Sequence, residues 1–288
     1  MPITPNETGH FAANDGVQLH FRVYNADNAK AGVLVQHGFA EHGGRYDNLI
    51  EPLLHAGYSV MTFDSRGHGL SGGTRVFIRD FREYTDDLAQ AVKTAQSKLP
   101  AKLFLFGHSM GGLVSLVFLR GGESGRVAGA QGLAGVVLSN PALANKVAVP
   151  AWKEMLARGA SRLAPGLKVP TGIPPEHVSR DAAEVKKYDK DPLNSKVATA
   201  RWYTEFVRLQ TEMQAQPQSV AGIPMLALIG DGDLIIDPAV GLKFFAGVGG
   251  DQLTIKTYPG FYHELINEPP ADARGVIKDV IAWLNDRV

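Results

Sequence analysis

A serine occurs in this sequence in a context that suits nucleophilic catalysis. The residues Gly107-His108-Ser109-Met110-Gly111 match the pattern G-x-S-x-G. They follow the apolar run 103–106 and open the apolar run 110–119, so we expect a strand before the serine and a helix after it. A serine at a sharp strand-to-helix turn exposes its hydroxyl at the carboxyl edge of a sheet. We therefore predict that Ser109 is a nucleophile that attacks an acyl carbonyl.

A serine nucleophile needs a base that takes its proton and an acid that orients the base. His263 is the only histidine after His177, which makes it the best candidate for the base. Three aspartates follow the apolar run 225–229 and are candidates for the acid, namely Asp231, Asp233 and Asp237. The chain order Ser…Asp…His is that of the α/β-hydrolase fold. Spacing alone does not choose among the three aspartates.

The negative charge of a tetrahedral intermediate requires hydrogen-bond donors. One candidate donor is the backbone N–H of Met110, at the start of the predicted helix. The second donor should follow an early strand. The run 33–36 leads into His37-Gly38-Phe39, so the N–H of Phe39 is the second candidate. Removal of one such donor costs about 2.7–4 kcal/mol in other enzymes.

The elements that must position these residues alternate between strands and helices. Residues 17–24 alternate apolar and polar side chains, which predicts a half-exposed antiparallel strand. Later runs are apolar throughout, as expected for strands buried on both faces of a parallel sheet: 33–36, 59–63, 103–106, 136–138 and 225–229. Residues 80–99 and 276–284 have helical spacing, and Asp80 with Glu83 resembles a capping box. We predict an α/β fold with a mostly parallel, doubly wound sheet and helices on both faces.

A long segment interrupts this alternation after Pro141. About 80 residues rich in proline precede the next clear strand, which is too long for a structureless loop. We predict a hydrolase core at 1–144 and 218–288 and a helical cap at 145–217. Two stripes of apolar side chains, at 152–163 and 202–213, indicate helices in this cap. The first stripe either packs on the main domain, the more common arrangement, or touches a lipid surface with its basic edge on the head groups.

Composition excludes several classes of protein. Lys and Arg number 29, as do Asp and Glu, so the formal net charge is zero and nucleic acid is not an expected partner. The 288 residues include no cysteine, which excludes disulfides, thiolate metal sites and cysteine nucleophiles. No signal peptide and no apolar run long enough for a membrane span are visible, so we expect a cytoplasmic protein. No pattern indicates the oligomeric state.

Several segments together resemble the monoacylglycerol lipase and lysophospholipase branch of the α/β hydrolases. These segments are His37–Tyr46 (HGFAEHGGRY), Phe63–Ser71 (FDSRGHGLS), Gly107–Gly112 (GHSMGG), Gly230–Asp233 (GDGD) and Gly260–Glu268 (GFYHELINE). The resemblance implies an α/β-hydrolase fold with an N-terminal antiparallel meander and a cap. It places the triad on Ser109, Asp233 and His263, and the oxyanion donors on Phe39 and Met110. It also places Glu41 and Arg45 near the glycerol end of the pocket, and it implies neither cofactor nor metal.

The function that the resemblance implies is hydrolysis of monoacylglycerols to fatty acid and glycerol through an acyl-enzyme. The expected partners are a lipid ester and, through the cap, a transient membrane or lipid-droplet surface. Two alternatives keep the same triad: a lysophospholipase and a carboxylesterase for short or medium chains. A non-catalytic interaction protein on the same fold is the remaining alternative. It predicts a missing triad residue, and none is missing.

Overall fold

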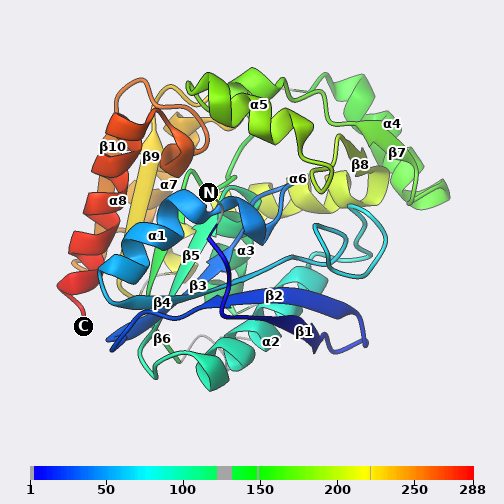
Figure 1. Ribbon diagram of the computed structural model, residues 1–288. Helices are drawn as coiled ribbons and strands as arrows, with labels where there is room; N and C mark the ends of the chain where they lie inside the picture. Colours follow the sequence, from blue (N-terminus) through cyan, green and yellow to red (C-terminus); the bar gives the residue numbers. More distant parts are fainter. Residues whose placement is uncertain (1–2, 122–131, 148, 221) are drawn as a thin grey trace.

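The computed structural model of the chain describes residues 3–121, 132–147, 149–220 and 222–288. In these ranges eight strands form one twisted sheet with the order β1-β2-β4-β3-β5-β6-β9-β10 (Figure 1). The strands are β1 (Glu7–Ala12), β2 (Gln18–Tyr24), β3 (Ala31–Gln36), β4 (Tyr58–Phe63), β5 (Leu103–His108), β6 (Leu133–Ser139), β9 (Met225–Gly230) and β10 (Leu253–Tyr258). The first two pairings, β1 with β2 and β2 with β4, are antiparallel, and all others are parallel. The predicted fold class is therefore confirmed.

The central strands are buried on both faces because their alternate side chains enter two different hydrophobic cores. In β5, Leu103 and Leu105 belong to one core, whereas Phe104 and Phe106 belong to the other. Helices cover both faces (Figure 1). The first core includes side chains of α2 (Arg82–Lys98), α3 (Met110–Arg120) and α7 (Pro238–Val248). The second core includes side chains of α1 (Asp47–His55) and α8 (Pro270–Asn285).

Strand β2 is antiparallel, as predicted, but the prediction that it is half exposed is wrong. His20, Arg22 and Tyr24 on its polar face are all buried. The Arg22 guanidinium donates to both carboxylate oxygens of Asp64, at 2.8 and 3.3 Å, and the backbone N–H of His20 donates to Ser71 Oγ. The loop after β4 thus covers this face and provides the carboxylate that allows the Arg22 guanidinium to be buried.

A mostly helical segment lies above the carboxyl ends of the parallel strands (Figure 1). It contains α4 (Ala151–Leu163), β7 (Lys168–Pro170), η3 (Pro175–His177), α5 (Ala182–Lys190), β8 (Val197–Thr199) and α6 (Ala200–Ala215). The short strands β7 and β8 pair antiparallel. The helices predicted from the two apolar stripes are α4 and α6. The division of the chain into core and cap at 145 and 217 stays a prediction.

The two apolar stripes have different environments. On α6, the stripe is buried and belongs to the first core. On α4, the predicted packing of the stripe on the main domain is wrong, because Trp152, Met155, Leu156 and Leu163 are 58, 68, 60 and 89% exposed. Helix α4 instead contacts α6 through its opposite side, where the Ser161 hydroxyl lies 2.8 Å from that of Thr204.

Candidate active site

Ser109 lies at the turn between β5 and α3 in a strained backbone conformation. Its φ and ψ are 52° and −117°, a region that residues with a side chain rarely adopt. The neighbouring glycines permit this turn. A Cβ on Gly107 would lie 2.6 Å from Ser115 Oγ, and one on Gly111 would lie 2.2 Å from the carbonyl oxygen of Gln36. The turn therefore exists only because both flanking positions lack a side chain, as the G-x-S-x-G pattern predicts.

His263 lies beside Ser109 in the loop that follows β10. Its Nε2 is 2.8 Å from Ser109 Oγ, and its Nδ1 is 2.7 Å from Asp233 Oδ2. All three side chains are buried. Burial by itself lowers the pKa of His263, but the charge and hydrogen bond of Asp233, with smaller contributions from nearby glutamates, outweigh burial and raise the pKa above its usual value. The arrangement can accept a proton from the serine hydroxyl and hold the resulting positive charge.

Of the three candidate aspartates, Asp233 is the one that contacts His263. Its other oxygen, Oδ1, accepts the backbone N–H groups of Ile235 at 2.7 Å and Ile236 at 3.0 Å, which fixes the carboxylate. Asp231 instead accepts the N–H of Gly260. Asp237 caps the start of α7 by accepting the N–H of Ala239. The latter two carboxylates therefore have local structural partners.

The two candidate oxyanion donors lie on either side of Ser109. Met110 is the first residue of α3, and Phe39 lies in the loop after β3. In the described ranges neither N–H has an intramolecular acceptor. Gly38 brings the loop close to Ser109, because a Cβ on Gly38 would lie 3.2 Å from the Ser109 Cβ.

His37 supports the loop that carries Phe39. Its Nε2 accepts the N–H of Ser65 at 2.8 Å, so the proton on the ring is at Nδ1 and is donated to the Gly38 carbonyl at 2.7 Å. Burial lowers the pKa of His37, which keeps the ring neutral and preserves this pair of bonds. The bonds of His37 therefore hold this loop in place.

Glu41 and Arg45 lie in a buried network of hydrogen bonds beside the triad. Glu41 accepts the N–H of Gly38, the Tyr46 hydroxyl and the Arg45 guanidinium, at 2.7, 2.8 and 2.8 Å. Arg45 also donates twice to Glu264, the residue after His263, at 2.7 and 2.8 Å. Burial raises the pKa of Glu41, but the charge of Arg45, the two neighbouring histidines and the N–H of Gly38 together outweigh burial and lower that pKa to about 2. Contact of either side chain with glycerol stays a prediction.

Two members of this network had no role predicted from the sequence. Glu264 belongs to the matched motif around His263, so its position next to the base was the available signal. Tyr188 lies on α5, and its ring covers the Arg45 guanidinium at 4.7 Å. No sequence pattern connects Tyr188 with Arg45, because the contact joins segments that are distant in the chain.

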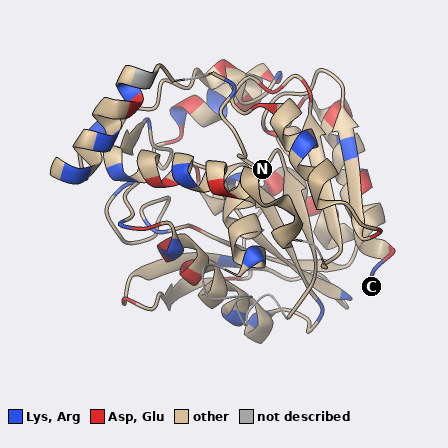
Figure 2. Cartoon of the chain, turned by 180° about the vertical axis from the view of Figure 1, so that it is seen from behind, with Lys and Arg blue, Asp and Glu red and all other residues tan. Residues whose placement is uncertain are grey.

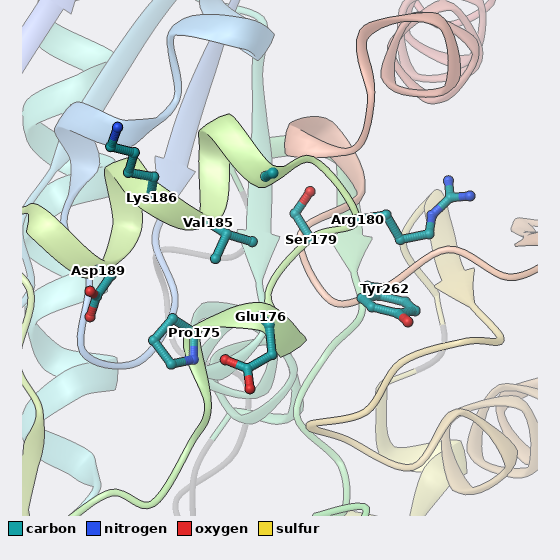
Figure 3. Close-up of a pocket in the computed structure, with 9 residues that line it drawn as sticks. Pro175, Glu176, Ser179, Arg180, Val185, Lys186, Asp189 and Tyr262 are labelled. Carbon is teal, nitrogen blue, oxygen red and sulfur yellow. The ribbon is translucent and has the colours of Figure 1, made fainter.

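A cavity of about 630 Å³ lies next to the His263 loop but contains no triad residue. Its lining comes from η3, α5 and their flanks, with Tyr262 from the loop after β10 beside them (Figure 3). Two acidic and two basic side chains line it: Glu176, Asp189, Arg180 and Lys186. The mixed charge defines no ligand. Among the described residues no group of three or more His, Asp or Glu side chains could hold a metal ion.

The sheet order, the strained serine turn and the covering helices define an α/β hydrolase. The chain belongs to the family described as Serine aminopeptidase, S33, which matches residues 27–270. It is 34% identical to a monoacylglycerol lipase of Mycolicibacterium smegmatis over 279 residues, 95% of each chain. It is 30% identical to phospholipase YtpA of Bacillus subtilis over 247 residues, which is 85% of this chain and 92% of that protein.

A solved structure agrees with these sequence relatives. The crystal structure of the Paleococcus ferrophilus monoacylglycerol lipase matches with a TM-score of 0.82 and 28% identity, covering 94% of this chain and 99% of that chain. The resemblance found in the motifs is thus confirmed, and the protein is a serine hydrolase.

Proposed function

We propose that the protein hydrolyses monoacylglycerols to a free fatty acid and glycerol, with Ser109, His263 and Asp233 as its catalytic triad. The observation that supports this most strongly is the continuous chain of contacts from Ser109 Oγ through the imidazole to Asp233, at 2.8 and 2.7 Å. Burial of all three groups strengthens these interactions because water does not screen them.

The reaction proceeds in two halves that use the same groups. Ser109 Oγ attacks the ester carbonyl while His263 Nε2 takes its proton, and the N–H groups of Phe39 and Met110 hold the negative oxygen. His263 then gives the proton to the leaving alcohol, which leaves an acyl-enzyme. A water molecule, deprotonated by the same imidazole, attacks the acyl-enzyme and releases the fatty acid. Asp233 orients the ring throughout and stabilises its charged form.

A neutral alcohol suits the charges beside the triad. Glu41 and Glu264 share one guanidinium, that of Arg45, so this network carries more negative than positive charge. This excess negative charge repels the phosphate of a lysophospholipid, whereas glycerol carries no charge. Glu41 and Arg45 would support the alcohol end through this network. The segment 145–217 would form a cap whose inner face receives the acyl chain, since ligand pockets are mostly apolar.

We also propose that the cap touches a lipid surface through α4. Helix α4 carries both the exposed apolar stripe and the basic residues Lys153, Arg158 and Arg162. Figure 2 shows basic residues along this helix. An amphipathic helix with this composition binds at the boundary of head groups and acyl chains. None of the helices in the described ranges combines the length and apolarity needed to cross a membrane.

The test compares fatty-acid release from 1-monooleoylglycerol, lysophosphatidylcholine and a butyrate ester. The proposal predicts that monooleoylglycerol is preferred, that Ser109→Ala abolishes release, and that Asp233→Asn lowers kcat by about 10⁴ as in other triads. Asp237→Asn is the matched control, because asparagine also caps helices and α7 stays intact.

A preference for lysophosphatidylcholine, which the phospholipase relative makes the second candidate, would change the proposed substrate but keep the triad. A preference for butyrate would identify a short-chain esterase. Loss of activity only in Asp237→Asn would refute the assignment of the acid.

A further inference from the structure

A four-residue turn at the end of β6 contacts the segments that carry all three triad residues. We name Ser139–Ala142 the β6 turn. Strand β6 lies between β5, which leads to Ser109, and β9, which leads to Asp233. The turn is therefore next to the nucleophile on one side and next to the acid on the other, and the loop of His263 lies against it.

The β6 turn fixes the backbone of the nucleophile on both sides. The Ser109 N–H donates to the Ser139 carbonyl at 3.0 Å, and the Ala142 N–H donates to the Ser109 carbonyl at 2.9 Å. These two bonds hold a residue whose φ of 52° is unfavourable. The turn also fits closely against α3, because a Cβ on Gly112 would lie 2.7 Å from the Cβ of Pro141.

The side chain of Asn140 binds the other two segments. Its Nδ2 donates to the carbonyl oxygens of Tyr262 and His263, at 3.0 and 2.9 Å, and its Oδ1 accepts the N–H of Gly230 at 2.8 Å. Gly230 is the last residue of β9, three positions before Asp233. The amide thus uses both donors and its acceptor, and the side chain is fully buried. No charge is involved, so the bonds persist at every pH at which the protein is folded.

We propose that Asn140 is a positioning residue that holds the His263 loop in register with Ser109 and with the strand leading to Asp233. This inference rests on the proposed triad. Asparagine suits the position for two reasons. Its planar amide offers two donors and one acceptor in a fixed geometry, and it tolerates the positive φ of 40° found here better than most residues do. A carboxylate cannot donate, and a glycine adopts this φ but makes no side-chain bond.

The test measures kcat and KM for a soluble ester, 4-nitrophenyl butyrate, per folded molecule, with the folded fraction taken from thermal unfolding. Asn140→Gly removes the three side-chain bonds, and glycine can still adopt the positive φ of this position. We expect its kcat to fall about 10–100-fold, because displacement of a catalytic group by about 1 Å costs up to 10²-fold, while KM changes less than about twofold. Asn28→Gly is the matched control: Asn28 is exposed, has a φ of 50°, and its replacement should leave both constants unchanged.

A second variant keeps the proposal testable if Asn140→Gly does not fold. Asn140→Asp has the same shape and retains the acceptor but loses both donors, so its kcat should also fall at least tenfold. Wild-type kcat in either folded variant, or a lower melting temperature with unchanged kcat, would overturn the positioning role. Ser109→Ala is assayed in parallel. If Ser109→Ala still hydrolyses the ester, the proposed triad itself fails, whatever the Asn140 variants do.

Discussion

The charges around His263, the proposed base, set the pH at which its imidazole becomes neutral. Burial lowers its pKa, and Asp233 opposes burial most strongly, followed by Glu264 and then Glu41. The sum raises the pKa above the usual value. Only the neutral imidazole accepts the serine proton, so activity should rise as the pH rises through this raised pKa. Two carboxylates that do not touch His263 therefore still affect its protonation.

Glu264→Gln tests this effect because it removes a negative charge next to the base and keeps the shape of the side chain. We expect the pKa of His263 to fall and the acidic limb of kcat/KM to move to lower pH, since loss of an anion destabilises the imidazolium. The measurement is the pH profile for a soluble ester. Asp251→Asn, an exposed carboxylate before β10, should leave the profile unchanged. An acidic limb that moves to higher pH in Glu264→Gln would contradict the electrostatic account.

The residues of the site differ in how far the sequence could predict them. Ser109 was predictable because its motif is local. The choice of Asp233 over Asp231 and Asp237 required the resemblance, since all three follow the same strand and only contacts separate them. Asn140 has no local signal: its three bonds reach residues 90 and more positions away in the chain. Long-range hydrogen bonds of this kind become visible only when the sheet is assembled.

Among the elements, α3 crosses β3 so closely that its first turn requires glycine. A Cβ on Gly111 would lie 2.2 Å from the Gln36 carbonyl oxygen and 2.5 Å from that of His37. Both obstacles are backbone atoms, which cannot move as side chains can. The close approach also brings the start of α3, with the Met110 N–H, next to the loop that carries Phe39.

Gly111→Ala should therefore destabilise the fold by about 1–3 kcal/mol, as expected for overpacking in a rigid core. Gly159→Ala is the matched variant: Gly159 lies within α4, and a Cβ there meets no atom within 4 Å. It should stabilise the helix by about 0.5–1 kcal/mol, because alanine loses less conformational entropy than glycine. Free energies of unfolding in urea measure both effects. Equal changes in the two variants would show that the helix crossing is not tightly packed.

Local patterns predicted most of the elements but not their surroundings. Strand β2 was expected to be half exposed because its polar residues alternate, yet Arg22 is buried by its pair with Asp64, 42 positions later. The capping box predicted at Asp80 and Glu83 does not form. Helix α2 begins at Arg82, whose N–H donates to the Asp80 carboxylate at 2.8 Å, and the Glu83 carboxylate accepts the N–H of Arg79, not that of Asp80. Strand β1 was not predicted, and it is defined by its pairing with β2.

At the scale of the whole molecule, the segment above the sheet is attached to the loop that carries Phe39. The Phe39 ring stacks on Trp202 of α6 at 4.1 Å between centroids. The Ser195 N–H donates to the Ala40 carbonyl at 2.8 Å. His42 lies 3.0 Å from Asp191. Movement of this segment would therefore also displace the loop that carries one of the proposed oxyanion donors.

The outer face of the same segment presents the apolar side chains of α4, and their effect depends on the form of the substrate. Met155→Ser with Leu156→Ser removes two exposed side chains, and full burial of each would stabilise binding to a lipid surface by about 1.5–3 kcal/mol. We expect at least tenfold weaker binding to anionic phospholipid vesicles and a similar loss of activity on monooleoylglycerol dispersed in them. Hydrolysis of a soluble butyrate ester should stay at the wild-type rate, because these side chains do not contact the triad.

Ile255→Thr, at an exposed apolar position on β10, is the control for general loss of surface hydrophobicity. If the double variant keeps wild-type vesicle binding, α4 does not dock on the lipid, and its apolar stripe has another partner.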